Sequence, residues 1–234
     1  MIFAAIFAGG SGSRMGESIP KQFLCVDSKP IIVHTVEKFV PEERFEKILV
    51  LCPSEWINKT KELIKEYIGE NDRIDVIEGG ETRNDTLMNA LAYIERNFDT
   101  DDDSIIVTHD GVRPFINQRI IDDNIKYASL YGACDTAIPA TDTIVYSEDN
   151  SFITNIPQRS KLYQGQTPQS FNIRKLERLS ASLTEEETAS LTDACKIFAI
   201  KGERVYIVQG EPSNIKITYP SDLKFAQAIA AQDK

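Results

Sequence analysis

The chain has 234 residues, of which 41% are hydrophobic and 26% are charged, an ordinary composition for a globular protein with one sizeable core. Its formal net charge of −10 argues against an extended nucleic-acid interface, because such an interface needs a broad basic surface. The apolar runs are too short to span a bilayer, and no basic residue precedes Arg14 as it would in a signal peptide. We therefore expect one cytoplasmic domain over residues 1–234, without membrane or nucleic-acid partners, in which a few local cations hold any anionic ligand.

Short runs rich in Ile and Val recur along the chain and predict buried strands. In chain order they are Ile2–Phe7, Ile48–Cys52, Ile74–Ile77, Ile105–Thr108, Thr136–Pro139 and Val205–Val208. Between them lie amphipathic stretches with helical spacing, at Ser54–Tyr67, Asn84–Phe98 and Asn117–Tyr131. This alternation predicts an α/β fold with a mostly parallel sheet, helices on both faces, and ligands bound beyond the carboxyl ends of the strands.

The first strand runs into a glycine-rich stretch, FAGGSGSRMGESIPKQF, from Phe7 to Phe23. Its glycines allow a tight turn that presents backbone N–H groups to an anion. The spacing is one residue too long for the dinucleotide motif GxGxxG, and the chain lacks the Gly-Lys dipeptide of a P-loop. Because Arg14 and Lys21 stand beside the turn, we expect it to bind a polyphosphate whose charge these cations neutralise.

Thr141–Arg159 breaks the alternation of strands and helices. Two runs of alternating residues flank the polar turn Ser147–Ser151, which predicts a β-hairpin projecting from the sheet. Two interpretations stay open: an ordinary surface hairpin, or an arm over residues 141–160 that embraces a second subunit.

Asp110 follows the fourth predicted strand, where a carboxylate could hold Mg²⁺ against phosphate oxygens or cap the next turn. The neighbouring His109 is expected to pack or hydrogen-bond structurally. The four cysteines, Cys25, Cys52, Cys134 and Cys195, are isolated from one another along the sequence. We therefore expect them to be small buried hydrophobic residues that form neither a zinc site nor a disulfide.

Several stretches in this order resemble the sugar-alcohol phosphate cytidylyltransferases, whose branches act on methylerythritol phosphate and on ribitol 5-phosphate. They are AGGSGSRMG with PKQF, GGETRNDTL, HDGVRPF, YQGQTPQSF, LTDACKI and NIKIT, and they span nearly the whole chain. YQGQTPQSF and LTDACKI are more similar to the ribitol branch. The methylerythritol branch usually has an acidic residue straight after the Thr-Asp pair, where this chain has Ala194.

The resemblance implies a Rossmann-like nucleotide-diphospho-sugar transferase fold and a homodimer joined by the arm. It also implies Mg²⁺-dependent transfer of CMP from CTP to D-ribitol 5-phosphate, giving CDP-ribitol for teichoic acid or polysaccharide synthesis, and pyrophosphate. The alternative acceptor is 2-C-methyl-D-erythritol 4-phosphate of isoprenoid synthesis. Because a phosphate oxygen already carries negative charge, the reaction needs alignment and charge neutralisation rather than a general base.

The same resemblance assigns roles to individual residues. The catalytic cations are Arg14, Lys21 and Lys216, and the metal ligand is Asp110. The nucleotide contacts are Phe7, Ala8, Gly9, Gly10, Gly80, Glu81, Thr82, Arg83, Asn84, Asp85, Thr86 and Gly111, the last standing where the family usually has Ala or Ser. The acceptor contacts are Asp142, Thr143, Arg159, Thr167, Thr192 and Lys216.

Some alternatives remain beside these roles. Arg83 could buttress its loop rather than contact the nucleotide, and Lys216 could be a solvated surface cation. The whole chain could instead be a catalytically silent nucleotide sensor or a dinucleotide-dependent dehydrogenase. CTP binding without pyrophosphate release would indicate the first, and NAD binding the second.

Overall fold

The computed structural model describes residues 1–10 and 19–232. Within these residues a seven-stranded sheet has the order β5-β4-β1-β6-β8-β7-β9. The strands are β5 (Ile74–Glu78), β4 (Phe45–Cys52), β1 (Ile2–Phe7), β6 (Ile105–Asp110), β8 (Tyr163–Asn172), β7 (Ala133–Pro139) and β9 (Tyr206–Gln209). Strand β8 runs antiparallel to both of its neighbours, whereas every other pairing in the sheet is parallel. The predicted mostly parallel α/β fold is therefore confirmed.

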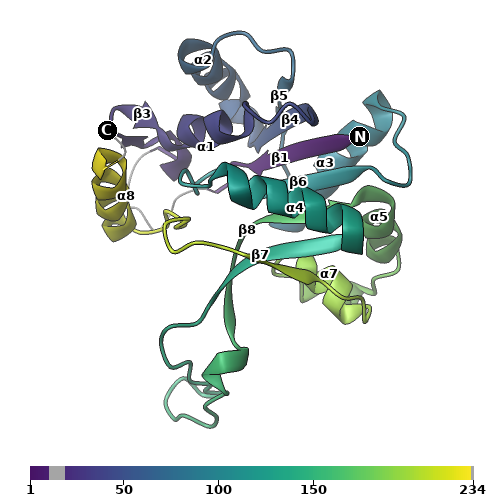
Figure 1. Ribbon diagram of the computed structural model, residues 1–234, viewed down its shortest axis with the longest axis vertical. Helices are drawn as coiled ribbons and strands as arrows, with labels where there is room; N and C mark the ends of the chain where they lie inside the picture. The colour runs from purple at the N-terminus through teal and green to yellow at the C-terminus, as the bar shows by residue number, and fades with distance from the viewer. Residues whose placement is uncertain (11–18, 233–234) are drawn as a thin grey trace.

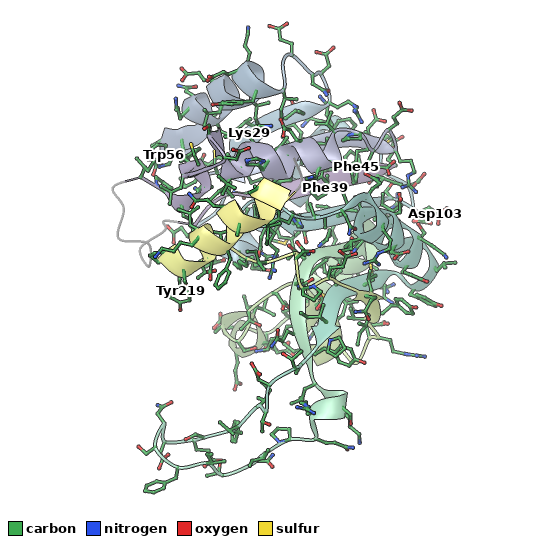
Figure 2. The ribbon with its side chains drawn as sticks, turned by 60° about the vertical axis from the view of Figure 1, so that its left-hand side comes forward. Lys29, Phe39, Phe45, Trp56, Asp103 and Tyr219 are labelled. Carbon is green, nitrogen blue, oxygen red and sulfur yellow. The ribbon has the colours of Figure 1, made fainter. Side chains whose placement is uncertain are left out.

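Helices cover both faces of this sheet (Figure 1). On one face, α1 (Ile31–Phe39), α2 (Ile57–Tyr67) and α4 (Gln118–Tyr131) pack on a core built from strand residues such as Ile6, Val50 and Val107. On the other face, α3 (Arg83–Asn97), α5 (Ile173–Ala181) and α7 (Cys195–Ile200) pack around Leu49, Ile106 and Phe171. Figure 2 labels Phe39 and Phe45, whose ring centroids lie 5.8 Å apart in the first of these cores.

Shorter elements complete the description. They are η2 (Lys21–Phe23), β2 (Cys25–Val26), β3 (Lys29–Pro30), η3 (Ser54–Trp56), η4 (Arg159–Lys161), α6 (Glu185–Ala189) and α8 (Pro220–Gln232). Strands β2 and β3 form a separate two-stranded sheet, and α8 packs over it through Ala226 and Val26. No helix in the described part of the chain is long and apolar enough to cross a membrane.

The predicted strands and helices are present, with ends that differ by a few residues. The polar strand β8 was not predicted, because its sequence YQGQTPQSFN lacks the apolar run of a buried strand. Two of its buried polar side chains find partners within the fold: the Ser170 hydroxyl donates to the Asn124 side chain at 2.9 Å, and the Gln166 amide donates to the Glu211 carbonyl at 2.8 Å. Such pairing removes the cost of burying polar groups.

The predicted hairpin is a loose loop rather than a regular two-stranded ribbon. Between β7 and β8 the backbone forms one isolated antiparallel bridge, Tyr146 to Asn155. The predicted turn is in place, since the Asp149 carboxylate accepts hydrogen bonds from the N–H groups of Ser151 and Phe152, each at 2.9 Å. A lone two-stranded ribbon is marginal without a third strand or a helix to cover it, which accounts for the missing ladder. The segment projects well away from the sheet in both views (Figures 1 and 2).

The expectation for the cysteines is correct for two of the four. Cys52 and Cys134 are buried, and burial raises the pKa of the Cys134 thiol to about 12. Cys195 is partly buried, and Cys25 is exposed on the short strand β2, where the expectation was wrong. The local reason is alternation: in the two residues of β2, Val26 faces the core and its neighbour Cys25 faces outward.

Candidate active site

The start of the glycine-rich loop is fixed by backbone hydrogen bonds at the end of β1. The Ala8 N–H donates to the Leu51 carbonyl at 2.7 Å, and the Gly111 N–H donates to the Phe7 carbonyl at 2.8 Å. The buried side-chain amide of Gln22 donates to the Ala8 carbonyl at 2.6 Å. Phe7 and Ala8 are thus held between β4 and the loop after β6, where parallel strands place a ligand.

Lys21 lies beneath this loop. A Cβ added to Gly10 would lie 3.5 Å from the Lys21 Cε, so the backbone passes close over the lysine side chain. The buried ammonium group of Lys21 donates to the Ile217 carbonyl at 2.9 Å. The Ile217 N–H in turn donates to the Val112 carbonyl at 3.0 Å. The segment NIKIT is therefore tied both to Lys21 and to the loop after β6, which places Lys216 across the cavity.

Asp110 forms the centre of a charge cluster. Its carboxylate pairs with Arg83, with Lys216 at 2.9 Å, and with the Arg113 Nε at 3.5 Å. Burial alone would raise the pKa of the Asp110 carboxyl, but the charges of Arg83, Lys216 and Arg113 hold that pKa well below its usual range. The carboxylate is therefore ionised at neutral pH, and the cluster has an excess of positive charge in a chain whose net charge is −10.

The loop before α3 approaches the same cavity closely. A Cβ on Gly80 would lie 2.2 Å from the Asp85 Cβ and 2.6 Å from the Asp85 carbonyl carbon, so no side chain fits there. Thr82 and Asp85 form a capping box at the start of α3. This fixes Arg83 in the first turn, with its guanidinium 5.0 Å from the centroid of the Phe7 ring. The positive end of the helix dipole therefore faces the cavity together with Arg83.

Two further cavities adjoin the first. The first cavity, of about 280 Å³, lies among Phe7, Gly10, Lys21, Gly80, Asp110 and Lys216. A second, of about 310 Å³, lies between the start of α3 and the segment before α7. A third, of about 170 Å³, lies between Asp110 and β8.

His109 and Thr167 form buried hydrogen bonds to the backbone of the charge cluster around Asp110. The His109 ring is fully buried, with Nδ1 at 2.9 Å from the Thr167 hydroxyl and Nε2 at 3.1 Å from the Arg113 carbonyl. Burial lowers the pKa of His109 to about 4. The Thr167 hydroxyl also accepts the Asp110 N–H at 3.1 Å. A buried neutral imidazole that is bonded at both nitrogens has the structural role expected from the sequence.

The sequence-predicted residues are distributed unevenly over these cavities. Those lining the first cavity are Phe7, Ala8, Gly9, Gly10, Lys21, Gly80, Glu81, Thr82, Arg83, Thr86, Asp110 and Lys216. Asn84 and Asp85 line the second, Thr167 lines the third, and Thr192 lines both of these. Gly111 lines none of the three and packs against Ile32 instead; a Cβ there would lie 2.8 Å from the Ile32 Cδ1.

Besides Gly111, four predicted residues lie apart from these cavities or outside the described residues. Asp142, Thr143 and Arg159 are exposed on the arm, where the Arg159 guanidinium donates to the Thr141 carbonyl at 3.0 Å. Arg14 lies outside the described residues. The sequence interpretation missed Gln22 and Arg113, which follow Lys21 and Asp110 inside the quoted motifs. Arg83 both lines the cavity and pairs with Asp110, so its two proposed roles are compatible.

The comparisons with known proteins agree with this geometry. The sequence model described as "IspD: 2-C-methyl-D-erythritol 4-phosphate cytidylyltransferase" matches residues 2–232. The chain belongs to the IspD family. It is therefore a nucleotidyltransferase of the cytidylyltransferase type, which excludes the dehydrogenase alternative.

Solved structures of the IspD family share the fold over almost the whole chain. The 4-diphosphocytidyl-2C-methyl-D-erythritol synthase of Anaerococcus prevotii has 27% identity and a TM-score of 0.82, over 99% of this chain and 96% of that one. The 2-C-methyl-D-erythritol 4-phosphate cytidylyltransferase of Francisella tularensis has 27% identity and a TM-score of 0.80, over 97% and 98%. The Thermus thermophilus cytidylyltransferase, at 23% identity and a TM-score of 0.74, shares the fold over 99% and 100%.

Enzymes that transfer phosphoryl groups from nucleotides commonly use a divalent metal ion at the phosphates. The described residues contain no group of three or more His, Cys, Asp or Glu side chains that could cage an ion. Mg²⁺ commonly binds through one or two carboxylates together with substrate phosphates and water. The single buried carboxylate of Asp110, in a cavity lined by Lys21 and Lys216, fits that second kind of site.

Proposed function

We propose that the chain transfers CMP from CTP to a sugar-alcohol phosphate, as a single domain with its catalytic centre in the first cavity. The observation that carries this proposal is the convergence of Lys21, Arg83 and Lys216 on one cavity walled by two glycine loops. Backbone groups of those loops can approach a triphosphate closely, and the cations neutralise its charge.

The reaction needs no proton acceptor. An acceptor phosphate oxygen forms a bond to the α-phosphorus of CTP, the bond from that phosphorus to the bridging oxygen breaks, and pyrophosphate leaves with the electron pair. Lys21 and Lys216 stabilise the charge that grows on the pyrophosphate. His109 is buried with both ring nitrogens hydrogen-bonded, and burial lowers its pKa, so it is a poor proton acceptor, in agreement with a mechanism without a general base. Arg14 is proposed to join these cations.

Asp110 would hold Mg²⁺ when the nucleotide is bound. The ion would supply further charge neutralisation at the phosphates. For this, Arg83 and Lys216 have to turn from Asp110 toward the triphosphate, which offers both cations several negative oxygens in exchange for one shared carboxylate. We therefore propose that Asp110 keeps the two cations neutralised and in position before CTP binds.

The cytosine and ribose are proposed to lie against Gly80–Thr86. Backbone groups can select cytosine there, because its edge offers one donor and two acceptors. The acceptor is proposed to occupy the third cavity, near Thr167 and Thr192. Arg113 lines the same cavity and adds a buried cation to it.

The comparisons support 2-C-methyl-D-erythritol 4-phosphate as the acceptor, since the family description and the similar structures carry that activity in their names. D-ribitol 5-phosphate, which the sequence motifs favoured, is the second candidate. The observation in its favour is Ala194, which is buried and lines the second cavity beside Asp193, at the position where the methylerythritol branch usually has an acidic residue.

The arm is proposed to join two copies of the chain. It exposes large apolar side chains to solvent, among them Phe152 at 73% exposure; the others are Ile144, Val145, Tyr146, Ile153 and Ile156. A monomer rarely exposes such a contiguous group, and a partner's surface would cover it. Arg159, Asp142 and Thr143 would then reach the partner's acceptor cavity, although they line none of the three cavities described in their own chain.

Pyrophosphate release from CTP in the presence of each acceptor tests the proposal. One acceptor should give a kcat/KM at least about 100-fold above the other, because a polar pocket built for one set of hydroxyls rejects the other. Preference for the methylerythritol phosphate would assign the function named by the relatives, and preference for ribitol 5-phosphate the second candidate. Release with neither acceptor would overturn the proposal.

A further inference from the structure

A buried glutamine side chain borders the third cavity with one end of its amide unpaired. Gln169 is 3% exposed and lines this cavity. Its Nε2 donates to the Asp135 carboxylate at 3.1 Å, but its Oε1 has no hydrogen-bond partner among the residues that the structure describes. Burying a carbonyl oxygen without a partner destabilises the folded protein, so such a group calls for an explanation.

Asp135 determines which end of the amide is unpaired. Gln169 lies opposite Asp135 on β7 and opposite Thr108 on β6, so the three side chains share one face of the sheet. Burial raises the pKa of the Asp135 carboxyl to about 7. Above that pH the ionised carboxylate can only accept hydrogen bonds, so it turns the glutamine N–H groups toward itself. The oxygen is left as a buried acceptor, for which the described residues supply no donor.

The other residues lining the third cavity fit a phosphorylated polyol. Arg113 and Lys216 provide positive charge for its phosphate, whereas Thr192 and Asp193 provide oxygens that can pair with hydroxyl groups. Gln169 lies among these residues, and its terminal torsion is soft enough for a small rotation to bring Oε1 onto a ligand.

We propose that Gln169 is a specificity-determining residue whose Oε1 accepts a hydrogen bond from a hydroxyl of the acceptor, and that Asp135 is the positioning residue that orients it. This inference rests on the proposed function, because it assigns the third cavity to the acceptor. It predicts that the enzyme distinguishes its acceptor from an analogue lacking that one hydroxyl.

The test measures kcat/KM for the preferred polyol phosphate and for each of its monodeoxy analogues. In the wild type, one analogue should lose about 10- to 100-fold, because the glutamine oxygen then stays buried without a donor. In Gln169→Met, which keeps the side-chain length and removes the amide, that loss should shrink to less than about threefold. KM for CTP should stay within about twofold, since the first cavity does not include Gln169.

Two more variants separate positioning from folding. In Asp135→Asn, residue 135 can offer either a donor or an acceptor to the Gln169 amide, so that amide can turn its two ends around. Discrimination between the acceptor and its deoxy analogue should then fall to an intermediate value. The double variant should discriminate no less than Gln169→Met alone, because both changes act through one hydrogen bond. Gln164→Met, an exposed change on the same strand, is the matched control and should keep wild-type discrimination.

The outcomes distinguish a failure of the role of Gln169 from a failure of the proposed function. If the wild type releases pyrophosphate with neither polyol phosphate, the proposed function fails and this inference fails with it. If the wild type is active and rejects a deoxy analogue, but Gln169→Met rejects it equally, the inference alone is overturned. Thermal unfolding of each variant verifies that it is folded, and if Gln169→Met does not fold, Asp135→Asn with unchanged discrimination overturns the inference.

Discussion

Burying the carboxyl group of Asp135 destabilises the folded protein when that group is ionised. Burial, more than any other cause, raises the pKa of its carboxyl to about 7. In the unfolded chain the pKa of an aspartate is about 4, so between these values the folded state binds a proton that the unfolded state has released. Stability therefore falls as the pH rises from about 4 to about 7, and the cost is fully present above that range.

We expect Asp135→Asn to stabilise the protein at pH 8 and to change it little at pH 4.5. Asparagine carries no charge to desolvate and can still accept the Gln169 bond. Because one pKa unit corresponds to about 1.4 kcal/mol, the gain should raise Tm by several degrees at the higher pH. Thermal unfolding of both proteins at the two pH values checks this. A Tm difference independent of pH would show that Asp135 is not charged at a cost.

Neighbouring atoms leave little room for a side chain at Gly111. A Cβ at this position would lie 2.8 Å from the Ile32 Cδ1 and 3.0 Å from the Phe7 carbonyl oxygen. We expect Gly111→Ala to destabilise the protein by about 1–3 kcal/mol through overpacking. Ile32→Val removes Cδ1, so the alanine should cost less in that background. Urea unfolding of the four proteins measures this coupling, and strictly additive effects would contradict it.

Asp110 is both the shared partner of three cations and the proposed ligand of the metal ion. Asp110→Asn leaves Arg83, Arg113 and Lys216 without their shared carboxylate, so the excess positive charge of the cavity increases. We expect tighter CTP binding without metal, together with a higher Mg²⁺ concentration for half-maximal activity, because an amide is a poorer ligand for a hard cation. Calorimetric titration with CTP in EDTA and a Mg²⁺ titration of kcat measure the two effects. Unchanged metal dependence would assign Asp110 a purely structural role.

At the scale of elements, the sequence predicted those strands, helices and loops that are marked by a local pattern of residue types. The apolar strands and amphipathic helices were recognisable, and so were the glycines and lysines that line the first cavity. Strand β8 was not, because its buried Gln166 and Ser170 are acceptable only through partners at Glu211 and Asn124. Likewise Gln22 and Arg113 were missed, since their carbonyl partners, Ala8 and Asn214, are joined to them only by the folded chain.

The arm gives a prediction about how two copies of the chain cooperate. If each acceptor cavity takes Arg159 from a partner, Lys21→Ala and Arg159→Ala are each nearly inactive. A mixed dimer of the two has both lesions in one site and none in the other. Random mixing makes half of the dimers mixed, each with one intact site, so activity should recover to about a quarter of the wild-type value.

Refolding the two variants together and measuring activity provides the readout, with refolded wild type as the control. Recovery in the control without recovery in the mixture would show that Arg159 acts within its own chain. The arm would then be an ordinary surface loop, and its exposed Phe152 and Ile153 would need another explanation.

At the scale of the whole molecule, the ends of the parallel strands bring two glycine loops, Asp110 and Lys216 of the NIKIT segment around one cavity. Membership of the IspD family accounts for this arrangement. The family and the fold were predictable because the motifs are ordered along the entire chain. The acceptor was not, because it depends on side chains such as Gln169 and Asp135, which meet only across neighbouring strands.

The most direct test of cytidylyl transfer in the first cavity is the initial rate of pyrophosphate release from CTP and Mg²⁺, with and without acceptor, in wild type and Lys21→Ala. We expect release that requires a polyol phosphate, forms one CDP-polyol per pyrophosphate, and falls about 100-fold or more in kcat in the variant, with a much smaller change in the Kd for CTP. The exposed change Lys61→Ala on α2 should have no effect. Release without an acceptor, or a Lys21→Ala enzyme that loses only CTP affinity and keeps its kcat, would contradict the assignment.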